Sequence, residues 1–209
     1  MCAKKRIALY GGTFDPVHSG HLEIARRVSE VFEIEKVIFV PAQVAPHKVG
    51  WPVTEPLHRF AMLALATQDD SRLVVSTFEL DEPDRRYTVD TIEHFQRELN
   101  DSTELFFIMG ADSWSEITTW REWERLLTMT DHIVVSRPGF ELTKDQVGPY
   151  GDRVFFTDVV MNDVSATNIR RLASEGSTDK LVDLLPGPVL EYIKKYGIYR
   201  ELNEGKLNS

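Results

Sequence analysis

IALYGGTFDPVHSGHL, residues 7–22, passes from a short apolar run through a pair of glycines into the start of an amphipathic segment. The run is continuous in apolar character, which predicts a strand covered on both faces over residues 6–10. Leu22, Ala25 and Val28 then recur at helical spacing and predict a helix. A strand, a tight turn and a helix together form the unit from which parallel sheets are built.

The same alternation continues along the chain. We expect six strands, at about Arg6–Tyr10, Lys36–Val40, Leu73–Phe78, Glu104–Met109, His132–Ser136 and Val154–Thr157. Helical patterns lie between them over about 57–65, 89–99 and 120–127, and a last helix covers about Val189–Tyr196. This order predicts a single α/β domain of the Rossmann-like, doubly wound type, with a mainly parallel sheet and helices on both faces.

The domain is expected to span residues 1–209, with C-terminal helices from about 160 and a frayed tail over 203–209. Open parallel sheets bind ligands at the carboxyl ends of their strands, where the strand order reverses. The loops after the first and fourth strands are therefore the expected site.

Composition narrows the class of protein. The 209 residues carry a formal net charge of -9, from 24 Lys and Arg against 33 Asp and Glu. This acidic balance disfavours binding to nucleic acid or to a membrane surface. Cys2 is the single cysteine, so neither an internal disulfide nor a structural zinc site is expected. No run approaches the roughly 18 apolar residues that span a bilayer, and no signal-peptide core is found, so we expect a cytoplasmic protein.

The loop after the first predicted strand carries donors suited to an anion. Gly11 and Gly12 permit a tight turn and the close approach of a phosphate to backbone N–H groups. His18 and His21 are three residues apart at the predicted helix start, so both imidazoles lie on one face of its opening turn. Such a pair is usually a surface feature, but its position behind a strand and a glycine turn, at a helix N-terminus, favours a phosphate site.

A second segment, VSATNIR at residues 164–170, has similar chemistry. Ser165 is a good N-cap, and Thr167 lies in the first turn that follows. Arg170 comes three residues later on the same face. A hydroxyl-rich helix start followed by an arginine predicts a second anion-binding site.

The two segments together resemble the HxGH nucleotidyltransferase superfamily. The signature is His18-Ser19-Gly20-His21, and residues 165–170 resemble the SSTxIR element, with Ala166 in place of the middle serine. The resemblance implies that both histidines contact the phosphates of ATP. It implies an ATP site formed by Gly11, Gly12, Thr13, Phe14, His18, His21, Gly110, Asp112, Ser165, Thr167 and Arg170.

Further segments resemble bacterial nicotinate-nucleotide adenylyltransferases, so that the similarity covers about Ile7–Tyr199. They are PHK at 46–48, YTVDT at 87–91, MGADS at 109–113 with Trp120 beyond it, and the VxRPG segment that ends at Gly139. The resemblance implies an acceptor site formed by Asp15, His47, Lys48, Thr88, Trp120 and Arg137. Trp120 is expected to stack on the pyridine ring, since an indole suits a flat electron-poor ring, although a tryptophan at helical spacing is more often part of a core.

The implied reaction joins nicotinate mononucleotide to the adenylyl group of ATP and releases pyrophosphate. His18, His21, Lys48 and Arg170 would stabilise the transferring phosphates. Mg²⁺ would accompany ATP, and no metal ligand is assigned in the chain. Transfer to nicotinamide mononucleotide or another phosphorylated acceptor, and a non-catalytic nucleotide-binding sensor module, stay open as alternatives. The sequence leaves open whether the chain is a monomer or a homo-oligomer.

Overall fold

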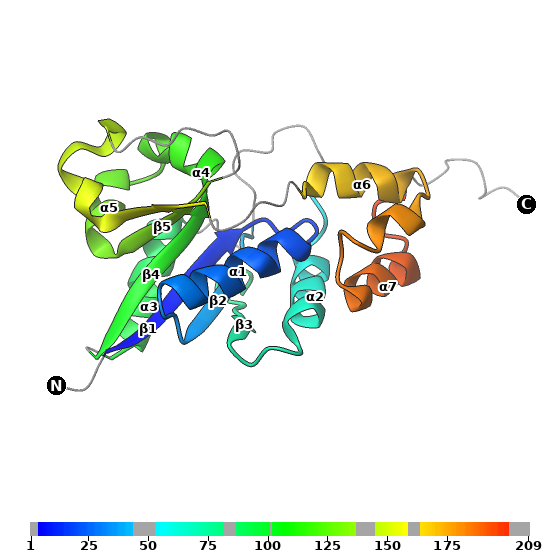
Figure 1. Cartoon of the computed structure of the whole chain (residues 1–209), viewed down its shortest axis with the longest axis horizontal. Helices are drawn as coiled ribbons and strands as arrows, with labels where there is room; N and C mark the ends of the chain where they lie inside the picture. Colours follow the sequence, from blue (N-terminus) through cyan, green and yellow to red (C-terminus); the bar gives the residue numbers. More distant parts are fainter. Residues whose placement is uncertain are drawn as a thin grey trace, which may run out of the picture.

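The strands of the computed structural model form one sheet in the order β3-β2-β1-β4-β5-β6 (Figure 1). The structure describes residues 4–43, 53–81, 87–100, 102–136, 145–158 and 164–200. Every strand pair is parallel. The strands are β1 Lys5–Gly12, β2 Lys36–Pro41, β3 Leu73–Val75, β4 Thr103–Gly110, β5 Asp131–Val135 and β6 Val154–Thr157. The predicted doubly wound parallel sheet is confirmed, and its order reverses between β1 and β4.

Helices connect the strands and cover both faces of the sheet. The α-helices are α1 Ser19–Val31, α2 Pro56–Thr67, α3 Thr88–Glu98, α4 Ala111–Ser115, α5 Trp123–Met129, α6 Ala166–Ser174 and α7 Gly187–Tyr196. The 3₁₀ segments among the described residues are η1 Ile117–Thr119, η2 Asp145–Arg153 and η3 Thr178–Leu181. Among the described helices, none is long and apolar enough to cross a membrane.

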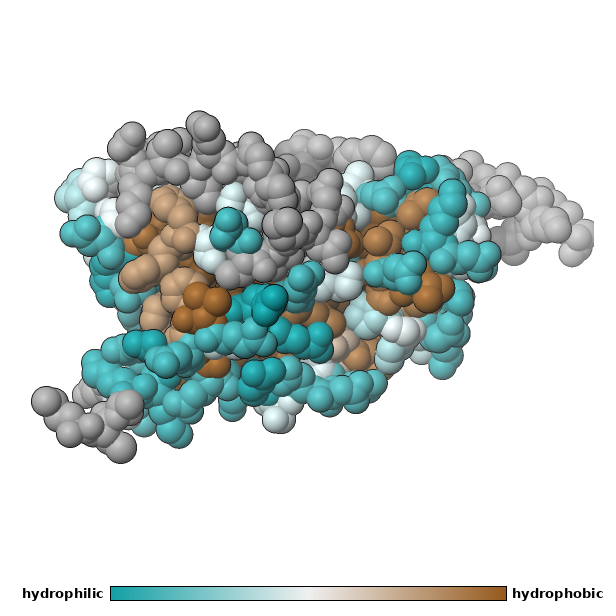
Figure 2. All heavy atoms as spheres, viewed as in Figure 1, coloured by the Kyte–Doolittle hydropathy of each residue, from teal (hydrophilic) through white to brown (hydrophobic). Residues whose placement is uncertain are grey.

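Successive side chains of a strand point to opposite faces, so β1 contributes to two separate cores. Ala8 and Tyr10 pack in a cluster with α1, α2 and the C-terminal helices. Leu9 packs on the other face with α3 and α5. Figure 1 shows α2 between the sheet and α7, and α6 to α7 form the end of the molecule beyond it. The space-filling view shows hydrophilic side chains over α1, the outer face of this layer (Figure 2).

The third strand is shorter than predicted. It ends at Val75 rather than Phe78, because the chain turns at once. The backbone N–H of Phe78 donates to Ser76 Oγ at 3.1 Å, and the N–H groups of Leu80 and Asp81 both donate to the Thr77 carbonyl. These local bonds replace the ladder that a longer strand would need.

The predicted helix over 120–127 is also wrong at its start. Glu122 has φ 53, in the left-handed region, so a right-handed helix cannot run through it. Trp120 caps η1 in an extended conformation, and α5 begins only at Trp123. The pattern of apolar residues was therefore read across a break in the backbone.

His132 in β5 is a buried histidine inside the second core, with 0% of its surface exposed. Its Nε2 lies 3.1 Å from the Leu126 carbonyl oxygen, which can only accept, so the ring proton is on Nε2. Burial lowers the pKa of His132 to about 4. The folded protein therefore holds this imidazole neutral where an exposed histidine takes up a proton.

This buried imidazole makes stability depend on pH. Between pH 6.5 and about 4 the unfolded chain binds a proton at His132 that the folded chain does not, so this contribution to stability is lost as pH falls through that window. The glutamine of His132→Gln can still donate to the Leu126 carbonyl but does not titrate. We therefore expect the free energy of unfolding to fall less steeply as pH drops in this variant, by on the order of 1 kcal/mol per pH unit. Urea unfolding of both proteins at pH 7.5, 6 and 5 measures this free energy. An identical dependence on pH in the two proteins would show that His132 does not cause the loss of stability.

Candidate active site

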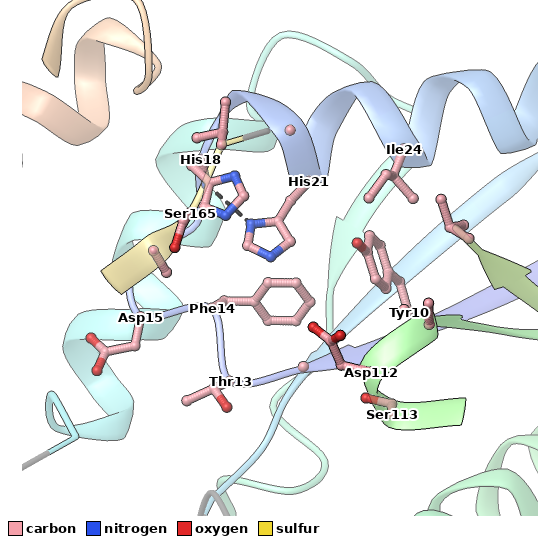
Figure 3. A pocket seen from close by; sticks show the side chains of 18 of the residues that line it. Tyr10, Thr13, Phe14, Asp15, His18, His21, Ile24, Asp112, Ser113 and Ser165 are labelled. Atoms are coloured by element: carbon pink, nitrogen blue, oxygen red, sulfur yellow. Dashed lines mark hydrogen bonds between the residues drawn. The ribbon is translucent and has the colours of Figure 1, made fainter. Parts of the chain in front are cut away.

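A cavity of about 410 Å³ lies at the carboxyl ends of β1 and β4 (Figure 3). This is the point at which the sheet order reverses, as the sequence predicts. The lining comes from the loop after β1, the first turns of α1, α4 and α6, and the end of β5. The lining residues are 10–15, 18, 20, 21, 24, 110–113, 135, 136 and 164–167. The two predicted phosphate segments, far apart in sequence, therefore share one cavity.

The two histidines of the first segment stack at the start of α1. Their ring centroids are 3.7 Å apart, and His18 occupies the N-cap position. The backbone N–H of His18 donates to Nδ1 of His21 at 3.2 Å, drawn as the dashed line in Figure 3. Because Nδ1 accepts, a neutral His21 carries its proton on Nε2. The structure thus fixes His21 as an N–H donor through that nitrogen.

Gly20 lies between the two histidines, at a position where a side chain would be too close to the ring of His18. A Cβ added there would lie 3.2 Å from Nδ1 of His18 and 3.3 Å from Cε1. Any larger residue would press on the His18 ring, which is itself buried. The glycine lets the imidazole lie against the first turn of the helix.

The Phe14 ring packs against the ring of His21 and against two further aromatic rings. Its ring centroid lies 5.0 Å from that of His21, 5.5 Å from Tyr10 and 5.4 Å from Phe39. Its backbone is left-handed, with φ 51, which turns the loop after the Gly11-Gly12 pair. Phe14 was predicted to bind ATP. Phe14 lines the cavity, and its buried ring packs against the ring of His21.

Asp15 was predicted to contact the acceptor, yet its carboxylate is engaged inside the protein. Its Oδ1 accepts from the Tyr199 hydroxyl at 2.6 Å, and its Oδ2 accepts from the Thr54 backbone N–H at 3.2 Å. Only 3% of the residue is exposed. In Figure 3 the carboxylate points away from the imidazoles. This geometry suits a residue that orients the loop.

The second segment begins α6 as predicted. Ser165 is at the N-cap position, although its side chain makes no capping hydrogen bond, and Thr167 follows in the first turn. Both line the cavity. Arg170 donates through Nη1 to the Asp15 carbonyl at 2.7 Å and through Nη2 to Thr167 Oγ1 at 3.2 Å. The guanidinium thus joins α6 to the loop after β1.

Gly110 and Asp112, predicted to line the nucleotide crevice, do line this cavity, as do Gly11, Gly12 and Thr13. Gly110 ends β4 at the N-cap of α4, and Asp112 lies in the first turn of that helix. Asp112 is exposed, so its carboxylate can reach a ligand. No group of three or more His, Cys, Asp or Glu in the described ranges is placed to hold a metal ion.

Of the predicted acceptor residues that the structure describes, Asp15 lines this cavity, whereas Thr88 and Trp120 do not. Trp120 is half-buried against the second core, and Thr88 is the first residue of α3. Arg121 lies over the Tyr87 ring, 4.7 Å from its centroid, which brings the segment after η1 to the start of α3. Trp120 and Thr88 are the sequence neighbours of this contact. His47, Lys48 and Arg137 lie outside the described residues, and their roles stay predictions.

Two residues that were not predicted from the sequence, Arg59 and Tyr199, bond to the loop after β1 that lines the cavity. Arg59 on α2 is 0% exposed and donates to the carbonyl oxygens of Thr13 and Ala42, each at 2.7 Å. The apolar residue at which the predicted helical pattern begins, Leu57, does not lie on the buried face of α2, since it is 75% exposed. The sequence held one indication of the role of Arg59. It stands at helical spacing from Met62, Leu63 and Ala66, which are buried residues of α2, so an arginine occupies the buried face of the helix.

The chain resembles known proteins along nearly its whole length. Residues 9–172 match the cytidylyltransferase-like family model. A probable nicotinate-nucleotide adenylyltransferase of Thermoanaerobacter sp. (strain X514) is 40% identical over 205 residues, covering 95% of this chain and 96% of that protein. The probable nicotinate-nucleotide adenylyltransferase of Desulfitobacterium hafniense (strain Y51) is 42% identical over 202 residues, covering 94% and 96%.

Among solved structures, nicotinic acid mononucleotide adenylyltransferase of Plasmodium falciparum, complexed with NaAD, superposes with a TM-score of 0.77. It covers 93% of this chain and 97% of its own at 21% identity, so this likeness is one of fold. The full-length sequence similarity carries the assignment further. The chain belongs to the nicotinate-nucleotide adenylyltransferases, within the cytidylyltransferase-like family.

Proposed function

We propose that this chain transfers the adenylyl group of ATP to nicotinate mononucleotide, giving nicotinate adenine dinucleotide and pyrophosphate. One observation carries the proposal: the histidine segment of α1 and the start of α6 converge on a single cavity at the switch point of the sheet. Full-length relatives that are 40% and 42% identical bear the name of this activity. With a single cysteine and ATP as substrate, the cytoplasm is the compartment we propose.

The cavity suits a triphosphate because its donors come from several directions. The N-termini of α1 and α6 supply backbone N–H groups and partial positive charge. His21 adds an N–H through Nε2, and Gly11 with Gly12 lets a phosphate approach the main chain. Arg170 does not line the cavity itself, but it bonds to the lining residues Asp15 and Thr167 and so adds a permanent positive charge beside the cavity. Anion binding here needs no lysine loop of the Walker type.

The chemistry requires positioning more than proton transfer. A phosphate oxygen of the mononucleotide attacks the α-phosphorus of ATP, and the bond from that phosphorus to the bridging oxygen of the leaving pyrophosphate breaks. A phosphate monoester, with a second pKa of about 6, is already largely dianionic at neutral pH, so no general base is needed. The two reactants repel each other. Catalysis then depends on donors that hold both anions and stabilise the charge on the transferring and leaving groups.

Mg²⁺ enters this proposal as part of the ATP substrate. It prefers phosphate oxygens with one or two carboxylates and several waters over a cage built by the protein. The exposed carboxylate of Asp112 at the cavity suits that mode. The ion would neutralise part of the triphosphate charge.

The acceptor is proposed to reach from the cavity toward α3 and η1. Trp120 would stack on the pyridine ring, and Thr88 would contact the acceptor from the first turn of α3. Gly110 and Asp112 line the cavity, and the chain continues from them through α4 to η1 and Trp120.

A panel of acceptors tests the proposed function directly. With ATP and Mg²⁺, nicotinate mononucleotide is expected to give the highest kcat/KM for pyrophosphate release, ahead of nicotinamide mononucleotide and other phosphorylated acceptors. A higher value for the amide would assign the enzyme to that substrate instead. Binding of ATP with no pyrophosphate release from any acceptor would indicate a nucleotide-binding module.

His21→Ala is expected to lower kcat by about 10²-fold, the scale of losing a preorganised donor to a transition state. Pyrophosphate release measures the loss, and circular dichroism with thermal unfolding checks the fold. His94→Ala, on α3 and outside the cavity lining, is the matched control and should keep normal turnover. Unchanged turnover in His21→Ala would refute the assigned role.

Trp120→Ala is expected to raise KM for nicotinate mononucleotide while KM for ATP stays near its original value. The reason is the loss of the stacking surface for the pyridine ring. Trp123→Ala serves as control, because Trp123 packs edge-to-face on Tyr150 within α5 and η2. If Trp120→Ala changes only the ATP parameters, the stacking role is wrong.

A further inference from the structure

Asp15 is the meeting point of three segments that are distant in sequence. Its carboxylate accepts from the hydroxyl of Tyr199, beyond α7, and from the backbone N–H of Thr54, before α2. Its carbonyl oxygen accepts from Arg170 on α6 at 2.7 Å. The same residue therefore contacts the C-terminal end of the fold with its side chain and the proposed phosphate-binding arginine with its main chain.

Arg59 on α2 holds the loop that contains Asp15, because it bonds to the main chain of that loop. Its Nε donates to the Thr54 carbonyl at 2.9 Å, and its two terminal nitrogens donate to those of Thr13 and Ala42 at 2.7 Å each. These carbonyls belong to the loops after β1 and β2 and to the segment before α2. Burial lowers the pKa of Arg59, and the nearby Asp15 opposes that effect. One guanidinium thus sets the spacing between the loop that carries the histidine segment and the loop after β2.

The contacts of Asp15 lead directly to Arg170. In the described part of the chain, Arg170 is held by two bonds only, to the Asp15 carbonyl and to Thr167 Oγ1. The direction of that carbonyl depends on the orientation of Asp15, which Tyr199 and Thr54 set through the carboxylate. A change at Tyr199 should therefore reach the guanidinium through one intervening residue.

We propose that Tyr199 and Arg59 are positioning residues for adenylyl transfer: they hold the loop at residues 13–15 and, through Asp15, fix the position of the Arg170 guanidinium beside the cavity. The inference rests on the proposed function, in which Arg170 contacts the phosphates of ATP. Neither residue lines the cavity, and each acts on the site through the loop that it holds.

The Tyr199 hydroxyl is a constant donor in this arrangement. Burial, with a smaller effect of Asp15, raises the pKa of Tyr199 far above its ordinary value. The phenol therefore stays protonated across the range from about pH 6 to about pH 9, where a free tyrosine also stays largely protonated. The effect of removing its hydroxyl on kcat should be the same throughout that range.

Tyr199→Phe removes the hydroxyl and keeps the ring. We expect kcat to fall about tenfold, the scale of one lost hydrogen bond to a charged group, with KM for nicotinate mononucleotide unchanged. Tyr192→Phe is the matched control, because it also removes a phenol hydroxyl, one that is bonded at 2.9 Å to His58 on α2 and lies outside the cavity lining. Its kcat should equal that of the unmodified protein. A normal kcat in Tyr199→Phe, or an equal loss in Tyr192→Phe, would overturn the inference.

A double-mutant cycle separates positioning from simple structural support. Arg170→Lys keeps the charge but cannot bond Asp15 and Thr167 together through a planar fork. If Tyr199 acts through Arg170, adding Tyr199→Phe to Arg170→Lys should cost less than threefold in kcat. Full additivity of the two losses would show that Tyr199 acts by another route, and the proposal would fall.

Arg59→Lys tests the second positioning residue. It is expected to lower both the melting temperature and kcat, since a lysine cannot donate to three divergent carbonyls. Kinetics are therefore compared at a temperature at which circular dichroism shows the variant fully folded. Full kcat under that condition would leave Arg59 a purely structural residue and remove it from the proposal.

Failure of the proposed function has a different signature. If the unmodified protein releases no pyrophosphate with any acceptor, the function is wrong, and binding of a non-hydrolysable ATP analogue by calorimetry then tests the network. Tyr199→Phe should bind the analogue several-fold more weakly, while Tyr192→Phe should not. Equal affinity in all three proteins would refute the positioning role independently of catalysis.

Discussion

The crossing of the chain between β1 and β4 is the constraint on which the site depends. β1 pairs with β2 on one side and β4 on the other, and the connections that leave it and return to β4 cover opposite faces of the sheet. The carboxyl end of β1 is therefore left without a helix across it. Gly11, Gly12 and Thr13 lie in that gap, and the first turns of α1, α4 and α6 surround it.

Electrostatics at this gap differ from those of the whole molecule. The chain carries a net charge of -9, which would repel a triphosphate at long range, yet the first turns of α1 and α6, whose backbone N–H groups carry partial positive charge, line the cavity. Main-chain N–H groups at helix starts cost no side-chain ordering when the ligand arrives, because the helix has already fixed them. The side chains that add to them are likewise fixed beforehand, His21 by the His18 N–H and Arg170 by the Asp15 carbonyl.

The sequence was informative where the signal is local. Strand positions follow from continuous apolar runs, and β6 at Val154–Thr157 coincides with its prediction. The histidine segment was recognisable because its strand, turn and helix start are adjacent along the chain. Local reasoning failed at Glu122, whose left-handed backbone breaks the helix expected from Trp120, and on α2, where the apolar pattern gave no weight to Arg59. The contact of Tyr199 with Asp15 was not predictable, because the two residues are 184 positions apart and neither forms part of a periodic pattern.

The burial of Arg59 has a physical explanation in the loops it holds. Where β1 and β2 end, their ladders end too, and the carbonyls of Thr13 and Ala42 turn inward without strand partners. An apolar residue at position 59 would leave each of these oxygens without a donor, at about 1–3 kcal/mol apiece. A guanidinium satisfies them together with Thr54, and its planar fork permits only a narrow range of loop positions. The bonds that stabilise the interior are thus the same bonds that determine where the loop after β1, and with it Asp15 and Arg170, stands before any ligand binds.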